Sequence, residues 1–328
     1  MHPCTFGQVL SVKMIDLQTM RAILFTTLAL SLTFLASCKK DDPDPAPPST
    51  PEVDNGPRLI LKFRFDSTQV RLNGQGQPEP ILPAGHAAQN PRFNTMSSHY
   101  VEFAPNAWTF PGQGDVVYHA AETTAGGANA IDFNQSVNVG QNGTFLNIPL
   151  SQLSAGTYEY LRVSLAYQNY DIDFRYDATS VGGSIMDLTG TLASFIGFNT
   201  YIGTFNVGQQ SVTVNDDKLQ GFWAFEVDPL PAPIPTPAPT VGQAPGVTTV
   251  PNPIFLSSPI PAGSCLVTGG FATPLVITGN ETEDLEIVVS LSTNQSFEWI
   301  DNGDGIFEPL AGDVVIDMGV RGLIPIVQ

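Results

Sequence analysis

Histidine is the residue type in this chain whose placement could serve metal chemistry. Three of the four histidines, His86, His99 and His119, lie in the body of the sequence. Imidazole nitrogen is a common ligand of zinc and copper ions, and His99 and His119 each adjoin a segment with strand-like alternation. No short His-to-His spacing joins the three residues, so a copper or zinc site here requires the fold to bring them together. The alternative is that each histidine is structural or solvent-exposed.

A second group of candidate ligands, Asp301, Asp304 and Glu308, lies in a glycine-rich segment. An EF-hand loop places calcium-binding oxygens at its first, third, fifth and twelfth positions around a glycine at the sixth. With the glycine after Asp304 in that place, the first and twelfth positions fall on Ile300 and Ala311, whose side chains cannot bind calcium. We therefore expect a hairpin turn between strands that end at Ile300 and Glu308, with a calcium site at the three acidic residues as the alternative.

Paired carboxylates raise the possibility of glycoside hydrolysis. The segment from Asp171 to Asp173 is similar to the acidic strand of one chitinase family, but Arg175 and Asp177 follow where that family carries its catalytic glutamate. A solvated strand face is therefore the preferred interpretation. The sequence also has no Gly-x-Ser-x-Gly elbow for a serine nucleophile, as α/β-hydrolases have. We expect no catalysis, and keep a carbohydrate-active enzyme as the second alternative to a binding protein.

The first part of the sequence has the pattern of a secretion signal. Ala22–Leu35 is a run of 14 uncharged residues that follows Arg21. A transmembrane helix needs about 20 apolar residues, so this run fits the apolar core of a signal peptide better. We predict a signal peptide over residues 1–37, with Met20 as the better start.

The residues that follow this run resemble the lipobox of bacterial lipoproteins, on the motif Leu35-Ala36-Ser37-Cys38. The resemblance implies that the Cys38 thiol receives a diacylglyceryl group and that the chain is cut just before it. The next four residues, two lysines and two aspartates, are similar to the export tag of Bacteroidota surface lipoproteins. We expect residues 38–57 to form a flexible, acidic, Pro-rich tether. The mature protein is then lipid-anchored at the outer membrane, facing the periplasm or the cell surface.

The charge and the cysteine content of the chain limit which molecules it can bind and which disulfides it can form. The formal net charge is −18, with only 13 lysines and arginines. A chain this acidic offers no basic patch for phosphates, which excludes a nucleic-acid role. With Cys4 and Cys38 assigned to the leader and the anchor, Cys265 has no partner for a disulfide, and we expect it to be a small buried side chain.

Alternating apolar residues, together with 30 glycines and 28 prolines, predict an all-β fold with little helix. Leu188–Phe195 also favours a strand, because it contains Gly190 and two threonines. Many short strands separated by turns are typical of an antiparallel β-sandwich, and we expect aromatic residues such as Trp108 in its core. We assign residues 58–328 to one such domain, interrupted by a Pro-rich excursion at 228–263. The alternative is that this stretch is a linker to a second domain at Ser264–Gln328. The other predicted strands are Arg58–Asp66, Tyr100–Phe103, Val116–Tyr118, Ala130–Phe133, Thr144–Ile148, Tyr158–Tyr167, Tyr170–Asp177, Ser211–Val214, Phe222–Val227, Leu285–Leu291, Phe297–Ile300 and Val314–Met318.

Two stretches resemble the MbnP-like family of β-sandwich proteins, which occurs in methanobactin copper-uptake operons and in Bacteroidota lipoproteins. One runs from Glu122 to Phe133, and the other runs from Leu153 to Tyr158 and into the strand that follows. The resemblance implies an envelope sandwich that holds copper, although it assigns no metal ligand in this chain. We expect an envelope lipoprotein that binds an unidentified surface ligand or protein without catalysis. The first alternative is an MbnP-like copper protein with His99 and His119 as ligands.

Overall fold

The structure is a computed structural model that describes residues 55–177, 179, 183–230, 235–244, 252–254, 257 and 266–328. The chain divides into two compact units, Met1–Glu52 and Val53–Gln328, and the described residues belong to the second. The predicted signal peptide, Cys38, nearly all of the tether and Cys265 lie outside them. Within the described residues, no helix is long and apolar enough to cross a bilayer.

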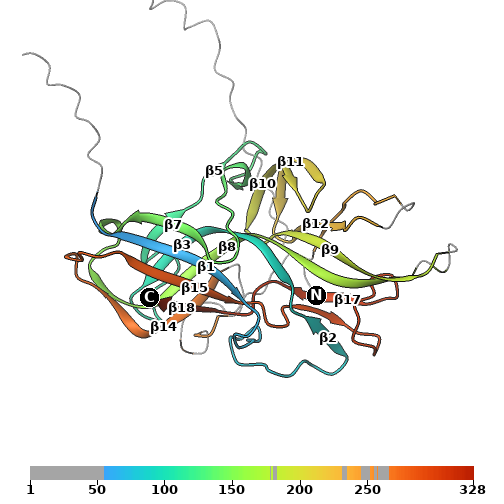
Figure 1. Cartoon of the computed structure of the whole chain (residues 1–328). Coiled ribbons are helices and arrows are strands. Elements are labelled where there is room, and N and C mark those ends of the chain that lie inside the picture. Colours follow the sequence, from blue (N-terminus) through green and yellow to red (C-terminus); the bar gives the residue numbers. More distant parts are fainter. Residues whose placement is uncertain are drawn as a thin grey trace, which may run out of the picture. The chain divides into compact units, whose positions relative to one another are not determined.

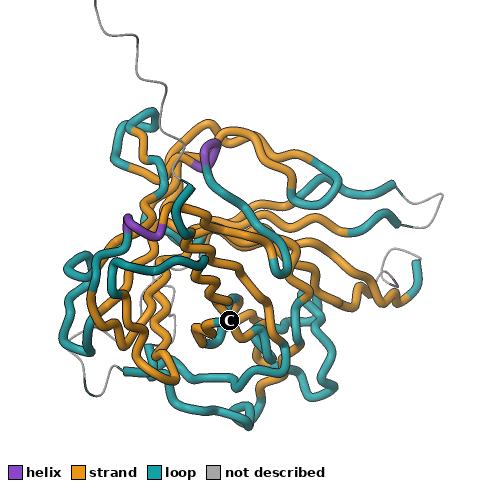
Figure 2. The backbone as a smooth tube through the Cα atoms, turned by 60° about the vertical axis from the view of Figure 1, so that its left-hand side comes forward, coloured by secondary structure: helices purple, strands orange, loops and turns teal. Residues whose placement is uncertain are grey.

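The described part is all-β, as the sequence predicts. Its strands form four sheets, and the helices described within it are two 3-10 turns, η1 (Phe133–Gln135) and η2 (Leu150–Gln152). Figure 1 shows the sheets as layers of long arrows, and Figure 2 shows the short helices at the margin of a body built from strands and loops.

One layer of the sandwich is a four-stranded sheet with the order β18-β15-β1-β7. Strand β1 pairs antiparallel with β7 and parallel with β15, so the sheet is mixed where the sequence suggested an antiparallel one. A parallel pair cannot be joined by a tight turn, and here nearly the whole domain lies between the two partners in sequence. The strands are β1 (Arg58–Asp66), β7 (Gly143–Pro149), β15 (Leu285–Ser292) and β18 (Leu323–Val327).

The other layer is a seven-stranded sheet organised around β8, the longest strand. Its first half pairs with β14 and its second half with β9, while β3 runs along its other edge. Strand β8 therefore extends from one end of the domain to the other. The strands are β3 (Arg92–Ala104), β4 (Asp115–His119), β8 (Gly156–Asp177), β9 (Ile185–Phe195), β12 (Phe222–Val227), β13 (Thr240–Gln243) and β14 (Leu266–Ile277).

Two smaller sheets complete the domain, with the orders β11-β10-β6-β5 and β17-β16-β2. Within the first, β6 and β10 pair in parallel. The strands are β2 (His86–Gln89), β5 (Glu122–Thr123), β6 (Ala130–Asp132), β10 (Asn199–Asn206), β11 (Ser211–Leu219), β16 (Phe297–Ile300) and β17 (Val314–Met318).

The main core lies between the two large sheets. The alternation predicted for Arg58–Asp66 is confirmed, because every second side chain of β1 is buried while those between are half-buried. Phe63 is fully buried and stacks on Phe145 of β7, with ring centroids 4.5 Å apart. Val101 of β3 and Val163 of β8 supply the opposite wall. Burying one such side chain contributes about 1.5–3 kcal/mol.

Two details differ from the sequence-based predictions. The separate strands expected at Tyr158–Tyr167 and Tyr170–Asp177 are one continuous strand, β8. The hairpin expected between strands ending at Ile300 and Glu308 is wrong, because β16 pairs with β17 and β2, and Ile306–Glu308 is not a strand. Leu188–Phe195 is a strand, as Gly190 suggested.

The segment after the Pro-rich stretch contributes to the same sheets as the segment before it. Strand β14 pairs with β8, and β15 pairs with β1. Only parts of the Pro-rich stretch itself are described, among them β13 on the outer edge of the large sheet.

Candidate metal centre

The strands β3 and β4 bring His99 and His119 together. Tyr100 pairs with His119 across the β3–β4 hairpin. On the other edge of β3, Ser98 pairs with Leu165 and Tyr100 with Ser164, so His99 is the extra residue of a β-bulge. A bulge redirects a side chain relative to regular alternation. The two imidazole rings meet edge to face, with centroids 4.7 Å apart and planes 65° apart.

A third potential ligand, Glu122 of β5, lies beside the two histidines. Its Oε1 atom lies 2.8 Å from Nε2 of His99 and 3.8 Å from Nε2 of His119. One potential ligand atom from each of the three residues lies within 4.8 Å of the others. Among the described residues, this is the one group of three His, Cys, Asp or Glu side chains that meets this condition.

The hydrogen bonds around the group orient these ligand atoms. Nδ1 of His119 lies 3.0 Å from the carbonyl oxygen of Ala120. A carbonyl oxygen only accepts hydrogen bonds, so this nitrogen carries a hydrogen, and Nε2 is the ring nitrogen that faces Glu122. The second oxygen of Glu122 accepts a bond from Asn129 Nδ2 at 2.7 Å. Asn129 thereby leaves Oε1 facing the histidines.

The surroundings of Glu122 and His99 shift the pKa of each side chain. The hydrogen bond from Asn129 is the main cause that lowers the pKa of Glu122, so its carboxylate is ionised. Burial lowers the pKa of His99, so its imidazole is neutral near pH 7. A metal ion binds neutral imidazole and ionised carboxylate. Nε2 of His99 donates a hydrogen bond to Oε1 of Glu122 at 2.8 Å, so an ion that binds this nitrogen would displace its hydrogen.

The three side chains of this group differ in how far they are exposed to solvent. The side chains of His99, Glu122 and His119 are 12%, 27% and 54% exposed. Phe198, which is itself 43% exposed, packs beside His99, with the two ring centroids 5.2 Å apart. Two imidazoles and one carboxylate leave at least one coordination position of a bound ion open on the solvent side.

The structure does not bring His86 to this pair. His86 lies on β2, and its Nδ1 atom is 2.6 Å from Oε1 of Glu298. The same carboxylate also pairs with Arg321 Nη2 at 2.5 Å and with Arg71. Both arginines are buried, so His86 contacts a carboxylate that is already paired with two buried cations.

The acidic residues of the candidate calcium site bind their own loop. Asp301 accepts hydrogen bonds from the backbone N–H groups of Gly303 and Gly305, and Asp304 accepts one from Ile306. Glu308 instead accepts a bond from the side chain of Asn302. These bonds give the loop its turns, and the three residues do not appear in the described metal-ligand group.

The carboxylates considered for glycoside hydrolysis are also engaged. Asp173 receives two hydrogen bonds from Arg92, at 2.9 and 3.0 Å. It borders a hollow of about 450 Å³ whose second acid, Asp187, is paired with Arg175. Each acid that faces this hollow is therefore held by an arginine rather than left free for proton transfer.

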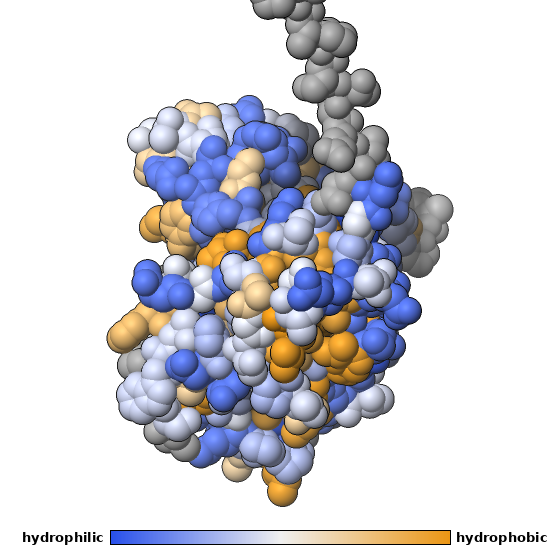
Figure 3. Space-filling view, turned by 90° about the vertical axis from the view of Figure 1, so that its left-hand side faces the viewer, coloured by the Kyte–Doolittle hydropathy of each residue, from blue (hydrophilic) through white to orange (hydrophobic). Residues whose placement is uncertain are grey.

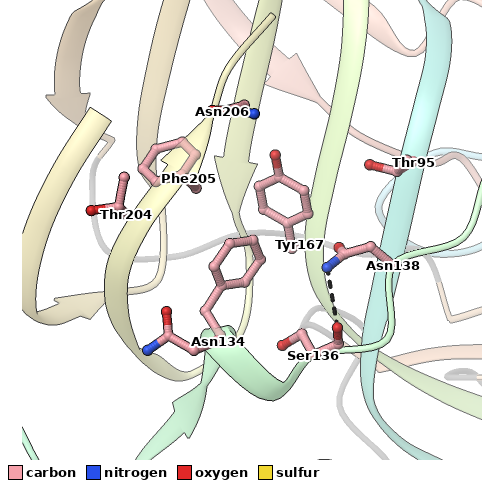
Figure 4. A pocket seen from close by; sticks show the side chains of 9 residues that line it. Thr95, Asn134, Ser136, Asn138, Tyr167, Thr204, Phe205 and Asn206 are labelled. Atoms are coloured by element: carbon pink, nitrogen blue, oxygen red, sulfur yellow. Dashed lines mark hydrogen bonds between the residues drawn. The ribbon is translucent and has the colours of Figure 1, made fainter. Parts of the chain in front are cut away.

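A second hollow, of about 370 Å³, lies where β3, β8, β10 and η1 meet. Tyr167 stands at its centre, with Asn134, Asn138 and Ser136 around it (Figure 4). Burial raises the pKa of Tyr167 to about 12, so the phenol is neutral. All the lining side chains are uncharged, which makes this hollow unsuited to an ion and compatible with a small neutral ligand.

The sequence analysis named two of the three residues in this group, His99 and His119, as candidate ligands. Glu122 appeared only within the stretch that resembles the MbnP-like family. The available signal was its spacing from His119, because residues three positions apart at the end of a strand can turn back toward each other. Comparison with protein-family models, curated proteins and solved structures finds no match for this chain.

Proposed function

We propose that this protein is an envelope lipoprotein that binds one copper or zinc ion through His99, His119 and Glu122. The observation that carries the proposal is the convergence of these three ligand atoms, which come from three different strands. This geometry favours metal binding over an unspecified surface ligand. The proposal keeps the non-catalytic role expected from the sequence.

The distances suit a first-row transition ion. Two ligands bound at about 2.0–2.1 Å in tetrahedral geometry lie about 3.3 Å apart. The separations from Glu122 Oε1 to the two histidine nitrogens, 2.8 and 3.8 Å, fall on either side of that value. Small side-chain rotations would then be enough to enclose an ion.

The donor set discriminates among metals. Calcium prefers a shell of oxygen ligands, whereas two imidazoles favour zinc or copper. For a given set of nitrogen and oxygen ligands, divalent copper binds more tightly than zinc. The implied MbnP-like resemblance points in the same direction, so copper is the first ion to test.

The test is metal titration of the chain from Lys39 onward, which retains every described strand. After chelator dialysis, we expect one equivalent of copper by mass spectrometry and an electron paramagnetic resonance signal with nitrogen ligation. His119→Ala should abolish this site. His86→Ala is the matched control and should retain it. Absence of a one-equivalent site, or its survival in His119→Ala, would overturn the proposal.

The lipid anchor is a separate part of the proposal with its own experiment. We expect labelled palmitate to attach to the protein when it is expressed in a bacterium that processes lipoproteins. Cys38→Ala should abolish the label and move the protein out of the membrane fraction. Unchanged fractionation of this variant would contradict anchoring at Cys38 without affecting the metal centre.

A further inference from the structure

The loop between β3 and β4, residues 105–114, exposes two large aromatic side chains. Trp108 is 70% exposed and Phe110 is 58% exposed, whereas the sequence led us to expect Trp108 in the core. The loop contains no charged residue. Single exposed apolar residues are common on protein surfaces, but two large rings on one uncharged loop form a concentrated apolar projection.

The loop is fixed by its own hydrogen bonds. The side chain of Asn106 accepts a bond from the backbone N–H of Trp108 at 2.9 Å. The backbone N–H of Gln113 donates to the carbonyl oxygen of Phe110 at 2.9 Å. Because these bonds fix the loop backbone that carries the two exposed rings, little backbone conformational entropy is lost when the rings enter a membrane.

The loop lies at the end of the sandwich where the chain enters it. Asp115, directly after the loop, accepts hydrogen bonds from the Ser154 backbone at 2.5 Å and the Tyr158 hydroxyl at 3.0 Å. Leu150 lies four residues before Ser154, and its backbone N–H donates to the carbonyl oxygen of Pro57 at 2.8 Å. Pro57 precedes β1, so the segment that leads back to Cys38 starts at this end. This end faces the viewer in Figure 3, where hydrophobic side chains gather in patches between hydrophilic ones.

Chain length limits how far this end can lie from the anchor. Cys38 and Pro57 are 19 residues apart, and a fully extended chain spans at most about 3.3–3.6 Å per residue. Pro57 therefore remains within about 65 Å of a membrane that holds Cys38. A lipid surface is thus the partner that this loop meets at high local concentration.

We infer that Trp108 and Phe110 insert into the interface of the bilayer that carries the lipid anchor. This inference rests on the anchoring proposed above. Tryptophan prefers the membrane interface because its ring is apolar and its N–H is polar. The neighbouring loop, which includes Asp284 hydrogen-bonded to the backbone of Arg58, is acidic. The fitting surface is therefore zwitterionic, because anionic headgroups would repel this end.

The experiment uses the chain from Lys39 onward, without lipid, and vesicles of phosphatidylcholine and phosphatidylethanolamine. Trp108 is the exposed tryptophan, while Trp299 is buried and Trp223 is half-buried. We expect vesicles to shift the emission to shorter wavelength and brominated lipids to quench it. The double variant Trp108→Ser with Phe110→Ser should reduce binding about tenfold or more, as loss of two buried aromatic rings requires.

Leu310→Ser is the matched control. Leu310 is 68% exposed and belongs to the loop after β16. In that loop, the carbonyl oxygen of Phe307 accepts a hydrogen bond from the backbone N–H of Arg175. Arg175 and Tyr158 lie near opposite ends of β8, so the loop of Leu310 is far from the loop of Trp108. This variant removes a similar exposed apolar side chain without touching the proposed surface, so its vesicle binding should equal that of the unmodified chain.

Three results would overturn the inference. These are an unshifted and unquenched emission, equal losses in the double variant and in Leu310→Ser, and a concentration-dependent dimer that Trp108→Ser abolishes. The last result would assign the loop to a second copy of the chain. Because the vesicle assay omits the anchor, its failure would leave lipid attachment at Cys38 and the metal centre standing.

Discussion

A bound metal ion should stabilise the fold, because its three ligands come from two sheets. His99 and His119 lie on β3 and β4 of the large sheet, whereas Glu122 lies on β5 at the edge of a small one. An ion that binds only the folded state adds about 2.7 kcal/mol at a free concentration one hundred times its dissociation constant. For a domain of this size, this gain corresponds to a rise of about 5 °C in the melting temperature.

The cleanest variant for this test is His119→Ala. The side chain of His119 is 54% exposed, so its loss should change the stability of the metal-free protein by about 0.5 kcal/mol or less. His99 is less suitable, because its ring is mostly buried and contacts Phe198 and Tyr100. Removal of His99 would lower stability even without metal.

The assay is thermal unfolding followed by circular dichroism, with chelator and with copper. We expect the copper-dependent rise in the unmodified chain and in His86→Ala, and no rise in His119→Ala. Equal copper-dependent rises in the unmodified chain and in His119→Ala would refute the argument. A fall in melting temperature with copper would refute it too, since it would show tighter binding to the unfolded chain.

Two further predictions concern the buried ion pairs near β16. Glu298→Gln should lower the unfolding free energy by about 3 kcal/mol, because it removes a charge that two buried arginines face. Glu286→Gln, which breaks a partly exposed ion pair with Lys62, should lower the unfolding free energy by only about 0.5 kcal/mol. If urea denaturation gave equal losses for Glu298→Gln and Glu286→Gln, the result would contradict this reasoning. Burial raises the pKa of Asp317 to about 6. The folded state therefore binds a proton at this carboxyl more tightly than the unfolded state does. The free energy of unfolding should fall as the pH rises from about 4 to about 6, where this proton is lost. In Asp317→Asn, the fall in unfolding free energy between about pH 4 and about pH 6 should be smaller by about 1–2 kcal/mol. An unchanged pH dependence would exclude Asp317 as its source.

Strands with regular alternation could be predicted from the sequence to the residue. Arg58–Asp66 and Phe222–Val227 have the predicted bounds, because one face of each is apolar throughout and turn residues flank it. Strand β14 was missed, since Gly269, Gly270 and Pro274 interrupt its pattern. Gly269 packs so closely against Leu323 of β18 that an added Cβ atom would lie 2.2 Å from its side chain. A close approach of this kind comes from packing between distant segments and leaves no local signal.

The continuity of β8 depends on distant segments in the same way. Gln168 and Asn169 break the apolar pattern and read as the end of a strand. Both are buried, and their side-chain amides donate to the carbonyl oxygens of Met318 and Val207, at 3.0 and 2.8 Å. Buried amides are tolerated when such partners exist, but the partners lie far away in sequence. A polar pair inside a strand therefore looked like a boundary.

The candidate site was predictable as residue types but not as geometry. His99 and His119 were recognisable because histidine is rare in this chain and both adjoin strands. Their meeting depends on the bulge at His99, which is set by the pairing between β3 and β8. Glu122 is one of 31 acidic residues, and its spacing from His119 was the one signal that set it apart. That spacing alone does not place its carboxylate beside His99, because β5 belongs to a different sheet from β3 and β4.

The β3–β4 hairpin connects the two proposals. Its loop carries Trp108 and Phe110, while β4 leads from that loop to His119 in five residues. At about 3.4 Å per residue, the metal centre lies about 14 Å from the start of the strand along its axis. If the loop enters a bilayer, the exposed side of the centre stays in water near the membrane surface, where a dissolved ion can reach it. The double loop variant should therefore bind copper with unchanged affinity, and a parallel loss of copper and vesicle binding would show that the hairpin, rather than each site, had been disrupted.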